Sequence, residues 1–231
     1  MQSNDSARTA APATGKLGMG IFLAALGMLF AASMVAYLIV RARAQAWPPP
    51  GMPRLPAGLW VSTIILLISS ATMHWALTSA RRDRHATLCG AMLITTLLGV
   101  LFLVSQTVNW IYLLALHMTD TPNLYAFTFY TLTGLHALHV LGGLVPLGVV
   151  TARAYAGRYS SEYHPGVIYC SMYWHFLDLV WLVMFALMFL FAQLGGSVSQ
   201  REGVASQHTA RAVRRATATR ARGATLKAHT E

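Results

Sequence analysis

The sequence predicts an all-α protein, a polytopic membrane helix bundle with five transmembrane helices. Three observations lead to this fold class. Hydrophobic residues make up 55% of the 231 residues and charged residues only 10%, whereas soluble domains carry about 25% charged residues. Nearly every Lys and Arg lies outside the apolar runs. Those runs are five in number, and each is long enough to cross a bilayer as a helix.

The five runs follow one another with short polar connections. The first run is too long to be the hydrophobic part of a cleaved signal sequence, so we expect it to remain in the membrane. A proline-rich connector follows it, because prolines interrupt a helix. A charged turn separates the second and third runs, and polar loops precede the fourth and fifth. The predicted spans are 17–40, 59–80, 86–112, 125–151 and 167–191.

The segments outside the bundle of residues 17–194 are polar. Residues 1–16 are small and polar, and residues 195–231 form a basic tail of low hydrophobicity, so we expect both to be disordered. The net charge is +10. Its basic residues are scattered over loops and the tail, which favours a topological role over nucleic-acid binding. We therefore expect no nucleic acid as a partner.

The distribution of basic residues predicts an orientation. Five spans place the termini on opposite sides of the membrane. Seven basic residues flank the spans on the amino-terminal side: Arg8, Lys16, Arg81, Arg82, Arg84, Arg153 and Arg158. Three lie on the other side before the tail: Arg41, Arg43 and Arg54. The tail adds seven more, most of them far from the last span. The positive-inside rule thus predicts a cytoplasmic amino terminus and a periplasmic carboxyl terminus, in a bacterial inner membrane.

Polar residues inside the spans are the candidate functional residues. An ionised side chain at the bilayer centre costs about 2.5–3.5 kcal/mol on insertion scales, so Asp178 must face protein or a wet cavity. At about 1.5 Å of rise per residue, Asp178 and His139 lie about 16 and 18 Å from the inner ends of their spans. We therefore expect them to pair. The same reasoning predicts a polar layer in the inner half of the bundle, made of His74, His136, His139, His175 and Asp178.

Several chemistries are open to this layer. Histidine pairs on membrane helices can hold a b-type haem, but each ligand must come from a different, facing helix. His136, His139 and Asp178 have the donor types of a metal site but no motif of specific spacing. A structural network that fixes helix register is the favoured interpretation, and a proton-handling role is the next. We expect no catalytic residue and no metal ligand in this chain.

Three stretches resemble one known family, subunit III of the haem–copper terminal oxidases in its short five-helix form. The stretch 133–140, Thr-Gly-Leu-His-Ala-Leu-His-Val with Gly134 near its start, is similar to the family's signature in span four. The stretch 173–181, which contains Trp174 and Trp181, is similar to the signature of its last span. The stretch 66–76 is similar to its second short-form span. The likeness covers residues 18–190.

The resemblance implies a supporting role in a respiratory complex. It implies a chain without haem or copper of its own, packed beside the catalytic subunit I and subunit II, which would hold those cofactors. It also implies bound structural phospholipid, contact with membrane lipids and support of proton uptake. The chain departs from the family where relatives carry acids, since Leu26, Asn109 and Ile168 stand at those positions. Proton support through the position of Leu26 is therefore not expected, whereas scaffolding and lipid binding are.

Two other functions fit part of this pattern. The missing acids are compatible with an accessory subunit of a nitric oxide reductase, because that complex has a different demand for protons. The membrane histidines are compatible with a free-standing b-type cytochrome. The identity of the co-purifying partner separates the first alternative from an oxidase, and a visible absorption spectrum of the isolated chain tests the second.

Overall fold

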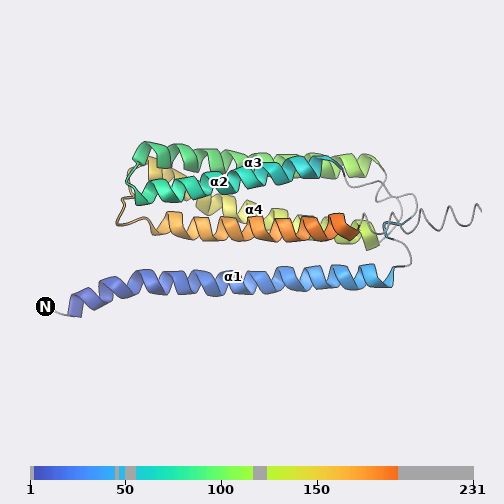
Figure 1. The fold of residues 1–231 in the computed structure, drawn as a ribbon, viewed down its shortest axis with the longest axis horizontal. Coiled ribbons are helices and arrows are strands. Elements are labelled where there is room, and N and C mark those ends of the chain that lie inside the picture. The colour runs from blue at the N-terminus through green and yellow to red at the C-terminus, as the bar shows by residue number, and fades with distance from the viewer. Residues whose placement is uncertain (1–2, 45–46, 50–55, 117–123, 192–231) are drawn as a thin grey trace, which may run out of the picture.

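The computed structural model describes residues 3–44, 47–49, 56–116 and 124–191, with side chains from residue 14 onward. Within these ranges the chain is helical and contains no strand. The helices are α1 (Ser3–Arg43), α2 (Gly58–Arg81), α3 (His85–Ala115), α4 (Leu124–Tyr155) and an unlabelled last helix, Pro165–Phe191, drawn in orange in Figure 1. Each contains a segment long and apolar enough to cross a membrane. The predicted five-helix membrane fold is confirmed.

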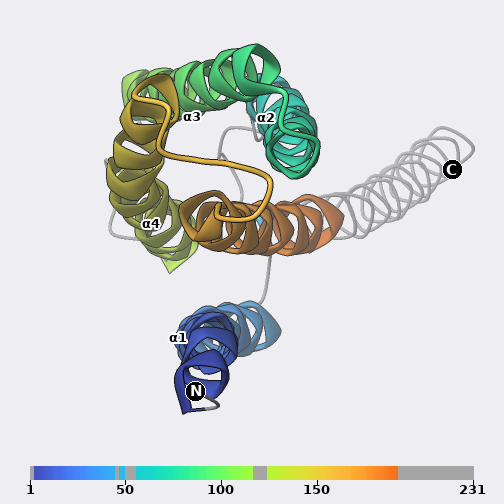
Figure 2. The same cartoon turned by 90° about the vertical axis from the view of Figure 1, so that its left-hand side faces the viewer.

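Four of the helices form a bundle, and α1 lies beside it. Figure 2 looks along the bundle and shows α2, α3, α4 and the last helix around a common centre, with α1 outside. Within the described part of α1, the buried side chains are Leu26, Phe30 and Tyr37, which share one face of the helix. The Phe30 ring lies 5.0 Å from the ring of His139 on α4. α1 thus has one narrow contact face, and most of its surface is exposed.

Hydroxyl pairs join neighbouring helices within the bundle. Thr72 on α2 bonds to Thr95 on α3 at 2.9 Å, and Thr96 on α3 bonds to Thr151 on α4 at 3.1 Å. Lipid tails are as apolar as leucine, so the hydrophobic effect does little to hold membrane helices together. Close packing of small residues and interhelical hydrogen bonds take its place. These pairs fix which faces of α2, α3 and α4 meet.

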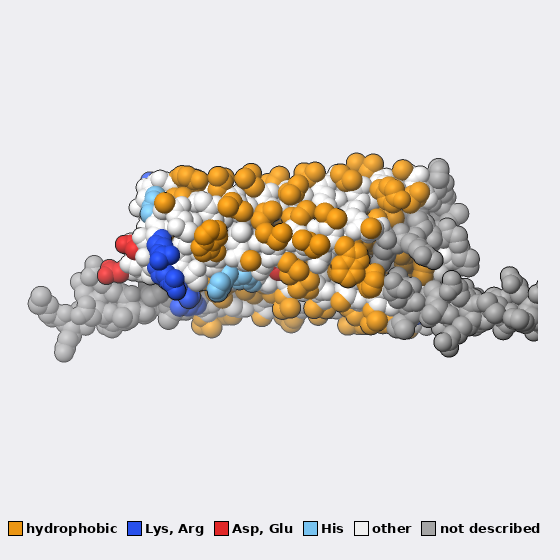
Figure 3. Space-filling view, turned by 45° about the horizontal axis from the view of Figure 1, so that its top comes forward, with side chains coloured by type: hydrophobic (Ala, Val, Ile, Leu, Met, Phe, Trp, Pro, Cys, Tyr) orange, Lys and Arg blue, Asp and Glu red, His pale blue; other side chains and the backbone are white. Residues whose placement is uncertain are grey.

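The charged residues gather at one end of the bundle. The turn between α2 and α3 meets the loop before the last helix there, because the Asp83 side chain accepts a hydrogen bond of 3.1 Å from the backbone of Ser161. Figure 3 shows basic and acidic side chains at this end and an apolar surface along the bundle. Both loops therefore lie on the same side of the membrane, as the order of the spans requires.

The amino-terminal end of the described chain is helical. α1 begins at Ser3 and continues into the first span, whereas residues 1–16 were expected to be a disordered tail. This stretch is rich in alanine, the strongest helix former, and it extends a helix that is already nucleated. The predicted disorder of residues 195–231 concerns a tail that lies outside the described residues.

Candidate functional site

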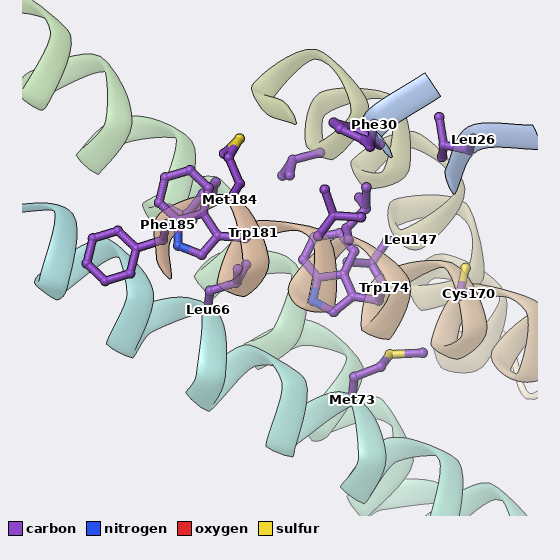
Figure 4. Close-up of a cluster of buried hydrophobic side chains, with 14 of the residues drawn as sticks. Leu26, Phe30, Leu66, Met73, Leu147, Cys170, Trp174, Trp181, Met184 and Phe185 are labelled. Atoms are coloured by element: carbon purple, nitrogen blue, oxygen red, sulfur yellow. The ribbon is translucent and has the colours of Figure 1, made fainter. Parts of the chain in front are cut away.

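Two tryptophans attach the last helix to α2. Trp174 is 2% exposed and its indole N–H donates to Ser69 Oγ at 2.9 Å. Trp181 is 1% exposed and donates to Thr63 Oγ1 at 3.0 Å. A tryptophan can be buried in this way when its N–H finds an acceptor. Figure 4 shows both indole rings among the buried side chains at the centre of the bundle. The two signature tryptophans therefore anchor helix packing.

Glycine makes room for these aromatic rings at two positions. A Cβ atom on Gly99 would lie 2.7 Å from Cη2 of Trp174, and one on Gly143 would lie 2.5 Å from Cε1 of Tyr173. A Cβ on Gly134 would meet nothing within 4 Å. Of these three glycines, the signature residue Gly134 is thus the one that close packing does not require. The need for Gly99 depends on which ring reaches it, and the sequence alone does not show that.

His136 lies in an aromatic environment. It is fully buried, with its ring centroid 5.1 Å from that of Trp181 and 5.8 Å from that of Phe102. Neither ring nitrogen has a hydrogen-bond partner among the described residues. His136 therefore packs as a ring between α3, α4 and the last helix. It forms no hydrogen bond with the other residues of the predicted polar layer.

His139 does not pair with Asp178, contrary to the prediction. Its Nδ1 donates to the carbonyl of Leu135 on its own helix at 2.7 Å, and its ring packs on Phe30 of α1. Neither carboxyl oxygen of Asp178 has a hydrogen-bond partner among the described residues. The two residues lie at similar depths but on different sides of the bundle. Helix rise gives the depth of a residue and leaves its direction around the helix open.

Asp178 lies closest to a different histidine, His175. The Nδ1 atom of His175 is 3.7 Å from Oδ2 of Asp178, which is beyond hydrogen-bond distance, and 2.8 Å from Oγ of Ser70 on α2. Asp178 is 5% exposed, whereas the His175 side chain is 37% exposed. The pair therefore lies at the junction of α2 and the last helix. The carboxyl group is inside and the imidazole is at the surface.

His74 stands on the surface of α2. It is exposed and makes no hydrogen bond with a described residue. It follows Ser70 by four residues, so both lie on one face of the helix. The predicted layer of five residues is thus divided among three places. His175 and Asp178 meet near His74, His136 is in the core, and His139 faces α1.

Neutral side chains that pack or form interhelical hydrogen bonds stand at the three positions where the family resemblance implied acids. Leu26 is buried on the contact face of α1. Asn109 is 5% exposed and donates to Ser62 Oγ at 3.3 Å, which joins α3 to α2. Ile168 is partly exposed on the last helix. Gln106, one turn before Asn109, is buried with both amide atoms unpaired among the described residues. These positions place apolar or neutral groups in the bundle.

A cavity between α1, α4 and the last helix was not predicted. Its volume is about 440 Å³, and its lining is almost entirely apolar. Phe22 of α1, Pro146 of α4 and Tyr173 of the last helix are among the residues around it. Such a space suits an apolar chain. It arises because α1 stands away from the bundle, and no pattern in the sequence shows that separation.

The described residues offer no metal centre. Nowhere in the described ranges do three His, Cys, Asp or Glu side chains come close enough to hold a metal ion. The set considered from the sequence, His136, His139 and Asp178, points in separate directions, as the contacts above show. The arrangement supports helix packing and polar contacts at one edge of the bundle.

Comparison with known proteins identifies one family. Residues 5–193 match the family described as "Cytochrome c oxidase subunit III". A protein of Synechocystis named cytochrome c oxidase subunit 3 is 41% identical over 75% of this chain and 74% of its own length. Proteins with this name from Thermostichus vulcanus and, as a probable member, from Mycobacterium leprae are each 32% identical over 75% of this chain and 86% of their own lengths.

Proposed function

Because this chain belongs to the cytochrome c oxidase subunit III family, we propose that it packs beside the catalytic subunit of its haem–copper oxidase without doing chemistry itself. In this role it supports assembly of the complex and sustained, proton-coupled oxygen reduction. The observation that supports this role is that buried polar side chains form hydrogen bonds to other helices of the same chain. The indole groups of Trp174 and Trp181 and the amide of Asn109 all bond between helices of this chain. Such bonds build a framework.

The proposed partners are the catalytic subunit I, which would carry haem and copper, and subunit II. The surface of the bundle favours association within the membrane, because exposed apolar side chains cover the described helices. α1 contributes many of them, since it touches the bundle along one face only. The relatives' names speak of an oxidase, so the alternative of a nitric oxide reductase subunit or a free-standing cytochrome is not favoured.

The cavity beside α1 is the proposed place for a structural phospholipid. Its apolar lining fits an acyl chain, and α1 carries Lys16 one turn before Met19, which lines the cavity. An ammonium group at the membrane surface favours an anionic headgroup. Delipidation of the purified complex should therefore loosen α1 from α4 and the last helix.

The proposed location is a bacterial inner membrane with the amino terminus in the cytoplasm. The inner end would be the one where Asp83 meets Ser161, because Arg81, Arg82 and Arg84 lie in the same turn. Clusters of Arg and Lys next to span ends stay on the cytoplasmic side. This orientation places His175 nearer the cytoplasmic end of its helix and Asp178 at the helix midpoint.

Co-purification tests the proposed function. The tagged chain, extracted from its native membranes in a mild detergent, should carry a larger subunit whose visible spectrum shows haem. That partner should consume oxygen with a reduced electron donor. A chain that elutes alone and colourless from membranes in which the oxidase is intact would refute the proposal. The spectrum of the separated chain also tests the b-type cytochrome, which would absorb without any partner.

A further inference from the structure

Two polar side chains lie in the centre of the bundle with unused hydrogen-bonding groups. Gln106 of α3 is 1% exposed, and His136 of α4 is fully buried. The amide nitrogen and oxygen of Gln106 and both ring nitrogens of His136 make no hydrogen bond with a described residue. A buried donor or acceptor without a partner is costly in an apolar interior. These atoms therefore require a partner.

The contacts between α3 and α4 place the two residues at a similar level. The helices run in opposite directions, and the indole N–H of Trp110 donates to Thr133 Oγ1 at 3.2 Å. Gln106 precedes Trp110 by four residues, and His136 follows Thr133 by three. Along antiparallel helices these steps lead the same way, by about 6 Å and about 4.5 Å. Gln106 and His136 therefore lie opposite one another.

Both side chains also turn toward the same part of the core. Gln106 lies about 40° around α3 from Phe102 on one side and from Trp110 on the other. The ring centroid of Phe102 is 5.8 Å from that of His136. Phe102 and His136 both pack on Trp181 of the last helix, each with ring centroids 5.1 Å apart. The amide and the imidazole thus converge between α3, α4 and the last helix.

The chemistry of these groups selects the ligand. The amide of Gln106 offers donors and an acceptor, and a neutral imidazole offers one donor and one acceptor. Water matches this set, because it donates and accepts hydrogen bonds at once. Buried waters in proteins make about three hydrogen bonds to polar groups that otherwise lack partners. Both side chains are closed off from the outer surface of the bundle, so neither a lipid nor a partner helix reaches them.

We propose that Gln106 and His136 hold a buried water site that bridges α3 and α4. A water that accepts from Nε2 of Gln106 donates to the unprotonated ring nitrogen of His136. A second water that accepts from the imidazole N–H donates to Oε1 of Gln106. The site lies between the two direct α3–α4 hydrogen bonds, made by Thr96 and by Trp110. It belongs to the chain itself and does not depend on the complex in which the chain works.

Cryo-electron microscopy of the purified, unaltered complex tests the site directly. At a resolution that shows ordered water, we expect a density peak within hydrogen-bond distance of both the Gln106 amide and a ring nitrogen of His136. A direct hydrogen bond between the two side chains, or a core with no peak between them, would overturn the inference.

Paired substitutions test whether the two groups share the site. Gln106→Leu or His136→Leu alone leaves the other polar group in the core, and each should lower the midpoint of thermal unfolding of this chain. The double variant removes both groups, so its midpoint should lie well above the value obtained by adding the two single shifts. Where a single variant does not assemble, recovery of assembled chain in the double variant gives the same comparison.

Thr107→Val is the matched control on α3. The Thr107 hydroxyl donates to the carbonyl of Leu103 on its own helix, on the exposed side. Its removal should leave the midpoint close to that of the unaltered chain. Single shifts of Gln106→Leu and His136→Leu that simply add in the double variant, or that do not exceed the control, would show that the two groups share no site.

Discussion

At the scale of single residues, Asp178 is a buried acid whose carboxyl oxygens have no hydrogen-bond partner among the described residues. Its carboxyl group lies 3.7 Å from His175 and is almost completely buried. Removing water from such a group is costly, so the site is stabilised only if donors are supplied. The carboxyl group therefore depends on the polar side chain beside it, His175.

Two substitutions of Asp178 separate charge from hydrogen bonding. Asp178→Asn keeps the shape and an oxygen acceptor facing Nδ1 of His175, whereas Asp178→Leu offers that imidazole no polar group. An interhelical hydrogen bond in a membrane contributes about 0.6 kcal/mol on average and up to about 1.7 kcal/mol. We therefore expect Asp178→Leu to lower the yield of assembled complex several-fold more than Asp178→Asn. Quantification of haem per tagged chain after purification measures this, and equal yields would contradict it.

The histidines show what the sequence can and cannot predict about single residues. The depth of each polar residue followed from helix rise, and His175 and Asp178 do lie together. The pairing of Asp178 with His139 was wrong, because depth says nothing about direction around the axis. His136 and His139 are three residues apart and differ by about 60° around α4. That angle is enough to send one ring into the core and the other toward α1.

At the scale of helices, close packing of α3 on the last helix depends on a missing side chain. Gly99 lets the Trp174 ring approach its backbone, and Leu144 of α4 lies nearly as close, 2.9 Å from an added Cβ. Both neighbours are buried or half-buried, so they have little room to move. Trp174 is also held in place by its bond to Ser69.

Substitution of Gly99 by alanine should therefore destabilise the bundle. Overpacking of a well-filled core typically costs about 1–3 kcal/mol, and the added methyl group would have to displace an indole ring. Gly90→Ala is the matched control on the same helix, since a Cβ there meets nothing within 4 Å. Thermal unfolding of the purified complex, followed through loss of this chain, should show a lower midpoint for Gly99→Ala alone. Equal midpoints for both variants would show that the helices adjust.

The helices themselves were predictable, and their contacts were not. Long apolar runs bounded by charge define a membrane span almost by themselves, which is why all five were found. The same composition makes both faces of a span apolar, so the pattern does not show which face is buried. For this reason the sequence did not predict that α1 lies outside the four-helix bundle or that a cavity lies beside it. The structure resolves it through pairs such as Trp181 and Thr63.

At the scale of the whole molecule, the orientation in the membrane decides which compartment each loop faces. The loop before the last helix lies at the end where Asp83 bonds to Ser161. Tyr163 in this loop is 67% exposed. Ala42, near the end of α1, is also exposed and lies at the opposite end of the bundle. One position on each side is therefore open to a reagent in water.

Cysteine labelling of these two positions tests the orientation. In a background with Cys89→Ala and Cys170→Ala, both buried thiols are removed. A maleimide that cannot cross membranes should label Ala42→Cys in intact spheroplasts and Tyr163→Cys only in inverted vesicles, because arginines next to the spans retain the Tyr163 loop in the cytoplasm. The reverse pattern would place the amino terminus outside. It would also place His74 and His175 in the periplasmic half of the membrane, because both lie nearer the Asp83 end of their helices.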